Sequence, residues 1–161
     1  MKYNSFEELP VWKDAIELAV RVFDLTAQCC FRGHAGTRNQ LENAVVSISN
    51  NIAEGFERGT TQELLTFLYI SRGSGGETRS MLHLLDRLPE FKDLKFEISD
   101  LKLRAVNVSK QLRGWADSLQ NSDIRGQRYL TDKSRRIAKE SQDREEFLEE
   151  LRRVREGSQA K

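Results

Sequence analysis

Two histidines and two cysteines are the residues in this 161-residue sequence whose types could bind a transition metal. Cys29, Cys30 and His34 lie close together in the sequence, and His83 could join them from a distant segment. Zinc sites use ligands at regular spacings, such as two cysteines separated by two to four other residues, and this set matches none of these patterns. Cysteines at the end of an amphipathic helix usually act as small apolar filler. We therefore expect no metal site and no cofactor.

A glycine-rich segment, RGSGGE at residues 72–77, has the composition of a phosphate-binding loop. Such a loop follows a β-strand and ends in Gly-Lys-Ser or Gly-Lys-Thr, whereas this segment interrupts a helical pattern and lacks the lysine. Glycine lowers helix stability by about 1 kcal/mol relative to alanine, so its repeated use within a helix needs compensation. Close packing of this helix against the preceding one is the expected compensation, and nucleotide binding is not expected.

Two carboxylates, Glu54 and Glu77, could form an acidic pair between neighbouring helices, as in di-iron proteins. That chemistry also needs Glu-x-x-His motifs, and neither histidine follows a glutamate by three residues. The alternative is a structural layer of hydrogen-bonded polar side chains between the two helices, formed by Asn51, Glu54, Ser74 and Glu77. Because an unpaired buried carboxylate is costly, each glutamate in such a layer needs a partner. We predict the polar layer, and we expect no catalytic residues and no small-molecule substrate.

The residues around these candidates have the periodicity of long amphipathic helices. Apolar residues recur at three- and four-residue steps in four segments, which predict helices near residues 10–29, 38–57, 61–88 and 94–120. Thr60 and Glu63 form a capping-box pattern at the start of the third segment. The fourth segment carries a heptad-like seam made of Leu94, Ile98, Leu101, Ala105, Val108, Leu112, Trp115 and Leu119. Four helices with short connections predict an all-α, antiparallel up-down-up-down four-helix bundle over residues 1–120.

Composition and cysteine usage favour a helical protein of the cytoplasm. Charged residues make up 32% of the sequence and only 2 residues are proline, which fits a helical protein better than a β-sandwich or barrel. Adjacent cysteines seldom form a disulfide, and this indicates a reducing compartment. Residues 1–10 lack the apolar region of a signal peptide, and no stretch approaches the roughly 18 apolar residues of a membrane-spanning helix. We therefore expect a cytoplasmic protein without a membrane partner.

Residues 121–161 differ from the predicted bundle and are interpreted as a charged, partly helical C-terminal extension. Six basic residues against one aspartate give residues 125–139 a net charge of +5, whereas residues 140–156 carry seven acids against four arginines, a net charge of −3. The basic segment could contact phosphates, and a tyrosine within it could stack on a base. Its candidate nucleic-acid-binding residues are Arg125, Arg128, Tyr129, Lys133, Arg135, Arg136 and Lys139. The acidic segment fits either a short amphipathic helix or a solvated tail.

Three stretches, residues 6–19 (FEELPVWKDAIELA), 40–58 (QLENAVVSISNNIAEGFER) and 67–77 (FLYISRGSGGE), resemble a bacterial protein family. They are similar to the four-helix-bundle family first named for proteins encoded in 23S rRNA intervening sequences, which looks related to the accessory variability determinant (Avd) of diversity-generating retroelements. The resemblance covers residues 6–119. It implies a homopentameric ring without catalytic residues, with nucleic acid or a reverse transcriptase as partner.

This sequence departs from the family pattern in the second predicted helix. Glu42 and Asn43 stand where family members commonly carry basic residues, and Ser49 stands where they carry a proline. Residues 1–120 hold 15 basic and 16 acidic residues, a net charge of −1, so the basic surface expected of an RNA-binding bundle is weakened.

Two functional hypotheses follow from the sequence. The first is an oligomeric, non-enzymatic accessory protein that binds structured RNA, or a protein that handles RNA such as a reverse transcriptase, with residues 125–139 as the electrostatic contact. The second is a protein–protein interaction scaffold without direct nucleic-acid binding. An enzyme ranks behind both, because no catalytic constellation is present in the sequence.

Overall fold

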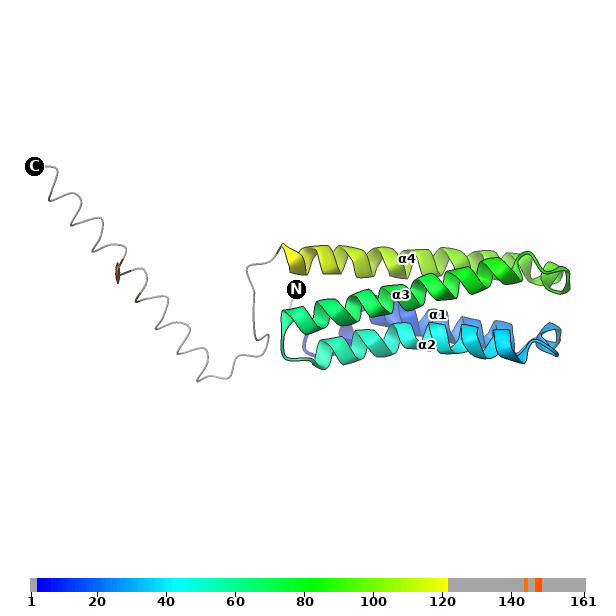
Figure 1. Ribbon diagram of the computed structural model, residues 1–161, viewed down its shortest axis with the longest axis horizontal. Helices are drawn as coiled ribbons and strands as arrows, with labels where there is room; N and C mark the ends of the chain where they lie inside the picture. The colour runs from blue at the N-terminus through cyan, green and yellow to red at the C-terminus, as the bar shows by residue number, and fades with distance from the viewer. Residues whose placement is uncertain (1–2, 122–143, 145–146, 149–161) are drawn as a thin grey trace, which may run out of the picture. The chain divides into compact units, whose positions relative to one another are not determined.

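The computed structural model describes residues 3–121, 144, 147 and 148, and the bundle is built from α-helices (Figure 1). The α-helices are α1 Pro10–Thr26, α2 Ala35–Glu57, α3 Thr61–Leu85 and α4 Lys95–Gln120. Short 3-10 helices precede α1 and occupy two of the connections: η1 Phe6–Glu8, η2 Cys29–Phe31 and η3 Pro89–Leu94. Each α-helix packs against the next one along the chain, and α4 also packs against α1. The predicted antiparallel four-helix bundle is therefore confirmed.

The chain divides into two units, Met1–Gly126 and Gln127–Lys161, and the bundle lies within the first. Three residues of the second unit, Arg144, Phe147 and Leu148, are described, and all three are helical and exposed. Within the described part of the chain, no helix is long and apolar enough to cross a membrane.

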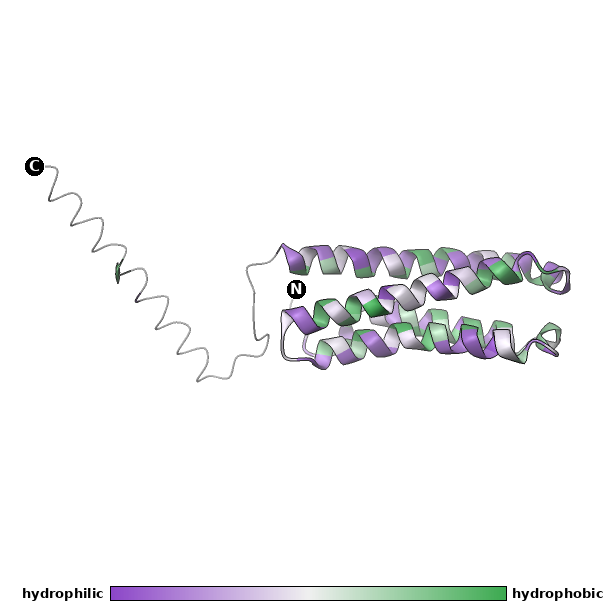
Figure 2. Ribbon diagram, in the orientation of Figure 1, coloured by the Kyte–Doolittle hydropathy of each residue, from purple (hydrophilic) through white to green (hydrophobic). Residues whose placement is uncertain are grey.

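The apolar faces of the four α-helices meet in one buried core, while polar residues cover much of the outer surface (Figure 2). The largest fully buried side chains are Leu18, Leu41, Ile48, Ile52, Leu64, Leu68, Leu82, Leu85, Phe91, Ile98, Leu101 and Leu112. Burying one such side chain stabilises the folded state by about 1.5–3 kcal/mol, so this core is the dominant favourable term in folding. The heptad-like seam predicted on α4 is confirmed by the burial of Ile98, Leu101, Ala105, Val108 and Leu112.

The connection between α1 and α2 departs from the prediction at both helix ends. α1 ends at Thr26 rather than near Cys29, which lies in η2. α2 begins three residues before the predicted Arg38, so Gly36 lies in its first turn instead of breaking the helix. Gly33 has a φ of +92°, a backbone conformation that glycine adopts without steric cost. The chain therefore reverses direction at Gly33, and the second glycine is not needed for the turn.

The two ends of α3 have identifiable causes. At its start, the Oγ1 of Thr60 accepts a hydrogen bond from the backbone N–H of Glu63 at 3.2 Å and donates one to the Glu63 carboxylate at 2.8 Å. The predicted capping interaction is thus confirmed. At its other end, α3 stops at Leu85, three residues earlier than predicted. The reason is that Leu88 precedes Pro89, and its backbone is extended with a ψ of 130°, as steric contact with a following proline requires.

α2 and α3 approach each other closely at small residues. A Cβ atom added at Gly55 would lie 2.6 Å from the Cβ of Phe67, so α3 packs directly against the backbone of α2 at this point. The fully buried Ser71 of α3 donates a hydrogen bond from its Oγ to the backbone carbonyl of Ile48 in α2 at 2.9 Å. A larger residue at either position would hold the two helices apart.

The glycines of residues 72–77 differ in their surroundings, and Gly75 is the closely packed one. A Cβ atom added at Gly75 would lie 3.9 Å from the Cδ1 of Ile48 in α2 and 3.1 Å from the Oγ of Ser109, so this glycine also allows α3 to approach α4. A Cβ atom added at Gly73 or Gly76 would have no heavy atom within 4 Å. The expected close packing is therefore found at Gly75, against α2 and also against α4, and is wrong for Gly73 and Gly76.

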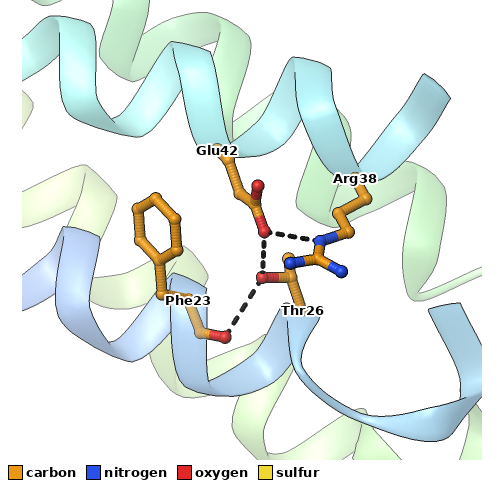
Figure 3. Close-up of polar contacts among 4 residues, drawn as sticks. All are labelled: Phe23, Thr26, Arg38 and Glu42. Atoms are coloured by element: carbon orange, nitrogen blue, oxygen red, sulfur yellow. Dashed lines mark hydrogen bonds and ion pairs between the residues drawn. The ribbon is translucent and has the colours of Figure 1, made fainter. Parts of the chain in front are cut away.

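The buried hydroxyl of Thr26 joins the end of α1 to α2 through a hydrogen bond with Glu42, which also forms an ion pair with Arg38 within α2 (Figure 3). The Oγ1 of Thr26 donates to a carboxylate oxygen of Glu42 at 2.6 Å, and the Nε of Arg38 donates to the same oxygen at 2.8 Å. The Glu42 side chain is only 14% exposed. Its burial would raise its pKa, but the hydrogen bonds from Thr26 and Arg38, together with the Arg38 charge, outweigh this and lower the pKa below the ordinary value of 4.5.

Replacing Gly55 with alanine should destabilise the bundle. Alanine favours the helix by about 1 kcal/mol, but overpacking against Phe67 costs about 1–3 kcal/mol, and the contact with a Cβ atom leaves little room to adjust. We expect a net loss of up to about 2 kcal/mol in urea unfolding. The control is Gly114→Ala, because a Cβ atom there meets nothing within 4 Å, and this variant should gain up to about 1 kcal/mol. A more stable Gly55→Ala protein would contradict the close approach of α2 and α3.

Glu42→Gln should destabilise the protein by about 1 kcal/mol at pH 7, because charge-assisted hydrogen bonds are lost. Since the pKa of Glu42 is lower in the folded than in the unfolded state, the contribution of its carboxylate is present above pH 4.5 and is lost as the pH falls through the folded pKa. The difference between wild type and variant should therefore shrink below pH 4.5 in chemical unfolding. The exposed Glu57, changed to Gln, is the control. If the difference in unfolding free energy between wild type and Glu42→Gln did not vary with pH, this role of the Glu42 charge would be contradicted.

Candidate nucleic-acid interface

The predicted polar layer between α2 and α3 exists in part, and a residue outside the prediction connects it. The Oγ atoms of Ser47 in α2 and Ser74 in α3 are 2.9 Å apart and share a hydrogen bond. The Nδ2 of Asn51 donates to the backbone carbonyl of Ser47 at 2.7 Å and to its Oγ at 3.0 Å. Asn51 and Ser74 therefore belong to one network, which is joined through Ser47.

The two glutamates predicted for this layer lie outside it. Glu54 has a side chain that is 51% exposed, and it pairs with Arg58 on its own helix. Glu77 is exposed on α3. The prediction is wrong for these residues because a carboxylate that can reach solvent avoids the cost of burial, whereas neutral hydroxyls and an amide can be buried when they bond to one another. The arrangement is structural and offers no acidic pair for catalysis.

The metal-ligand candidates are also placed in structural roles or at the surface. Cys29 and Cys30 lie in η2, and the ring of His34 packs edge-on against Phe91 with 5.5 Å between centroids. His83 is exposed on α3. Among the residues that the structure describes, no three His, Cys, Asp or Glu side chains are grouped so that they could hold a metal ion.

A groove of about 460 Å³ runs between α3 and α4 and has a strongly basic lining. Four of its lining residues are cationic and none is acidic. The lining residues, four from each helix, are Tyr69, Arg72, Gly73, Arg79, Val106, Ser109, Lys110 and Arg113. Cations therefore project from both walls, so an anion in the groove would meet positive charge on two sides.

The small residues of α3 provide the space for this groove. α3 comes close to α4 at Gly75, where an added Cβ atom would lie 3.1 Å from Ser109, and Ser109 lines the groove. Gly73, one wall residue, leaves open space where any other residue would place a side chain. Gly73, which weakens α3 as an isolated helix, thus leaves space in the groove.

The cations of the groove are largely unpaired within the described residues. Arg72, Arg79 and Lys110 form no ion pair there, and Arg113 makes only an exposed contact of 3.5 Å with Asp117 on its own helix. Like charges gathered in one groove repel one another and create a local positive potential, which a bound anion would relieve. Phosphate oxygens, like those of carboxylates, match the planar, forked donors of arginine.

The groove was missed when the sequence was considered alone, although a signal was present. Arg72 and Arg79 are seven residues apart, so they lie on one face of a helix, and Lys110 and Arg113 are three residues apart on another. The near-neutral net charge of residues 1–120 concealed this cluster. The candidates chosen from the sequence, residues 125–139, lie outside the described residues.

The sequence model of the 23S rRNA-intervening sequence protein matches residues 7–114 of the chain. This range includes all eight residues that line the groove and ends before the charged extension. A solved structure of a protein of unknown function from the S23 ribosomal protein family of Bacteroides thetaiotaomicron has a TM-score of 0.59 and 20% identity, and the alignment covers 66% of this chain and 97% of that chain. At this identity the likeness shows the fold alone. No curated protein matches the chain significantly.

Proposed function

The chain belongs to the 23S rRNA-intervening sequence protein family, and we propose that it is a non-enzymatic accessory protein that assembles into a homo-oligomeric ring and binds structured RNA. The observation that carries this proposal is the basic groove between α3 and α4. Its four cations come from two helices, and no acidic side chain lines it. Phosphate contacts of this kind supply affinity without sequence preference, which suits a protein that recognises RNA by its backbone.

Residues 125–139 remain a proposed second contact with RNA. Their six basic residues against one acid would add to the attraction of the groove, because electrostatic contributions to RNA binding accumulate with the number of phosphates contacted. A reverse transcriptase or another protein that handles RNA is a further proposed partner, which rests on the resemblance to Avd. The competing function is a protein–protein interaction scaffold that does not touch nucleic acid.

Self-assembly is supported by two separate exposed apolar stripes on the bundle. On α1, Ile16, Val20 and Phe23 are at three- and four-residue steps, and Val20 is 52% exposed. On α4, Phe96 and Leu103 are seven residues apart and are 84% and 64% exposed. If the α1 stripe of one subunit meets the α4 stripe of the next, the contact is heterologous, and such contacts close into rings when the rotation allows. We propose a pentamer from the family resemblance.

Removing two groove cations should weaken RNA binding and reduce its dependence on salt. For Arg79→Gln combined with Lys110→Gln, one change on each wall, the slope of log affinity against log salt should fall in magnitude by roughly 0.7 per lost contact, about 1.4 in total. The matched control is Arg32→Gln combined with Arg87→Gln, which makes the same change in net charge at exposed positions outside the groove. Fluorescence anisotropy with a labelled RNA hairpin measures both.

Equal affinities and slopes for these two double variants would exclude the groove as the RNA contact. Deletion of residues 121–161 separates the remaining sites: loss of binding only on deletion would place the contact in the extension. If no form of the protein binds RNA at low salt, the scaffold function is favoured instead.

Light scattering should give the wild-type protein the mass of several subunits of 18.6 kDa each. A charge placed in either apolar stripe, as in Val20→Asp or Leu103→Asp, should dissociate the ring, because an unpaired charge in a buried contact is costly. Leu84→Asp, at an exposed position outside the stripes, is the control. A mixture of the two stripe variants should form dimers, since each supplies one intact face. A monomeric wild-type protein at micromolar concentration would contradict assembly.

A further inference from the structure

One end of the basic groove carries an exposed aromatic ring held in place by a hydrogen bond. Tyr69 of α3 lines the groove and is 44% exposed. Its hydroxyl oxygen accepts a hydrogen bond from the Nε2 of Gln120, near the end of α4, at 2.6 Å. This contact restricts the ring in the free protein, so a ligand that stacks on it loses less conformational entropy on binding. The groove therefore combines phosphate-binding cations with an available aromatic face.

The cations are spread along the groove, and this favours a chain of phosphates over one small anion. Arg72 and Arg79 are seven residues apart on α3, which corresponds to about 10 Å along the helix axis. Lys110 and Arg113 are three residues apart on the opposite wall, about 4.5 Å along the axis of α4. One phosphate could bridge Lys110 and Arg113, but a set of cations spread over about 10 Å of α3 offers contacts to more than one phosphate. A nucleic-acid backbone can contact such a set in succession.

The partly exposed Tyr69 distinguishes an unpaired strand from a duplex as the ligand of the groove. Either could place phosphates along the four cations, but the bases of a duplex are stacked on one another and present no free face, whereas unpaired bases stack on tyrosine. We propose that the groove binds an unpaired strand of RNA, with phosphates along the four cations and one base against Tyr69. This inference rests on the proposed function and specifies its partner.

The test compares three labelled probes on the full-length protein by fluorescence anisotropy. The probes are an RNA strand of about 16 nucleotides without self-complementarity, the same strand annealed to its complement, and an abasic ribose–phosphate strand of equal length. Tyr69→Ala should weaken binding of the intact strand by roughly 5- to 100-fold, the value of one base–aromatic stack. Tyr69→Phe keeps the ring and should stay within about threefold of wild type. Ile70→Ala, at an exposed position that does not line the groove, should bind as wild type does.

The abasic strand separates stacking from every other effect of the substitution. If Tyr69 stacks on a base, Tyr69→Ala and wild type should bind the abasic strand equally, and the duplex should bind wild type more weakly than the intact strand. Equal binding of intact strand and duplex, or an intact-strand affinity that Tyr69→Ala does not change, would overturn the inference. In either case a reduced salt slope for Arg79→Gln with Lys110→Gln would leave RNA binding by the groove in place. If the double variant also has the same salt slope as wild type, both the unpaired-strand inference and RNA binding by the groove are overturned.

Discussion

Close packing of α3 against both of its neighbours is the constraint on which the rest of this bundle depends. On one side, the backbone of α2 at Gly55 meets Phe67, and the hydroxyl of Ser71 bonds directly to an α2 carbonyl. On the other side, Gly75 lets α3 approach Ser109 of α4. A helix with three glycines among six residues has poor intrinsic stability, so tertiary contacts must hold α3 in its helical form.

The basic groove is a consequence of this packing. Gly75 brings α3 and α4 together, and the absence of a side chain at Gly73 leaves space between the outer parts of the two helices. Arginine and lysine have long apolar stems, so they can line such a space while their charged groups stay in contact with water. The bundle thus has a local positive surface although residues 1–120 carry a net charge of −1, and local charge decides where an anion binds.

Ionic contacts elsewhere connect helices at partly exposed positions. Asp86 at the end of α3 accepts a hydrogen bond from Lys102 of α4 at 2.8 Å, and this contact lowers the pKa of Asp86. On α4, the hydrogen bond from Arg104 lowers the pKa of Asp100, which also pairs with Arg21 of α1. Ion pairs that remain in contact with water contribute little to stability. They help to fix which helices are neighbours, while the apolar core supplies most of the stabilisation.

The amino-acid sequence by itself determined the helices, their order and most of the core, because the three- and four-residue spacing of apolar side chains is a local property that any bundle must satisfy. The Thr60 cap and the α4 seam are local in the same sense. The tertiary structure alone decided which polar residues meet. Glu54 faces solvent, and Ser47 connects Asn51 to Ser74 through hydrogen bonds. The groove brings together two cations of α3, Arg72 and Arg79, and two of α4, Lys110 and Arg113. Contacts between helices depend on how the helices are rotated and how far apart they lie. Steric contacts at Gly55 and Gly75 set this geometry, and the spacing of residues along one helix does not encode it.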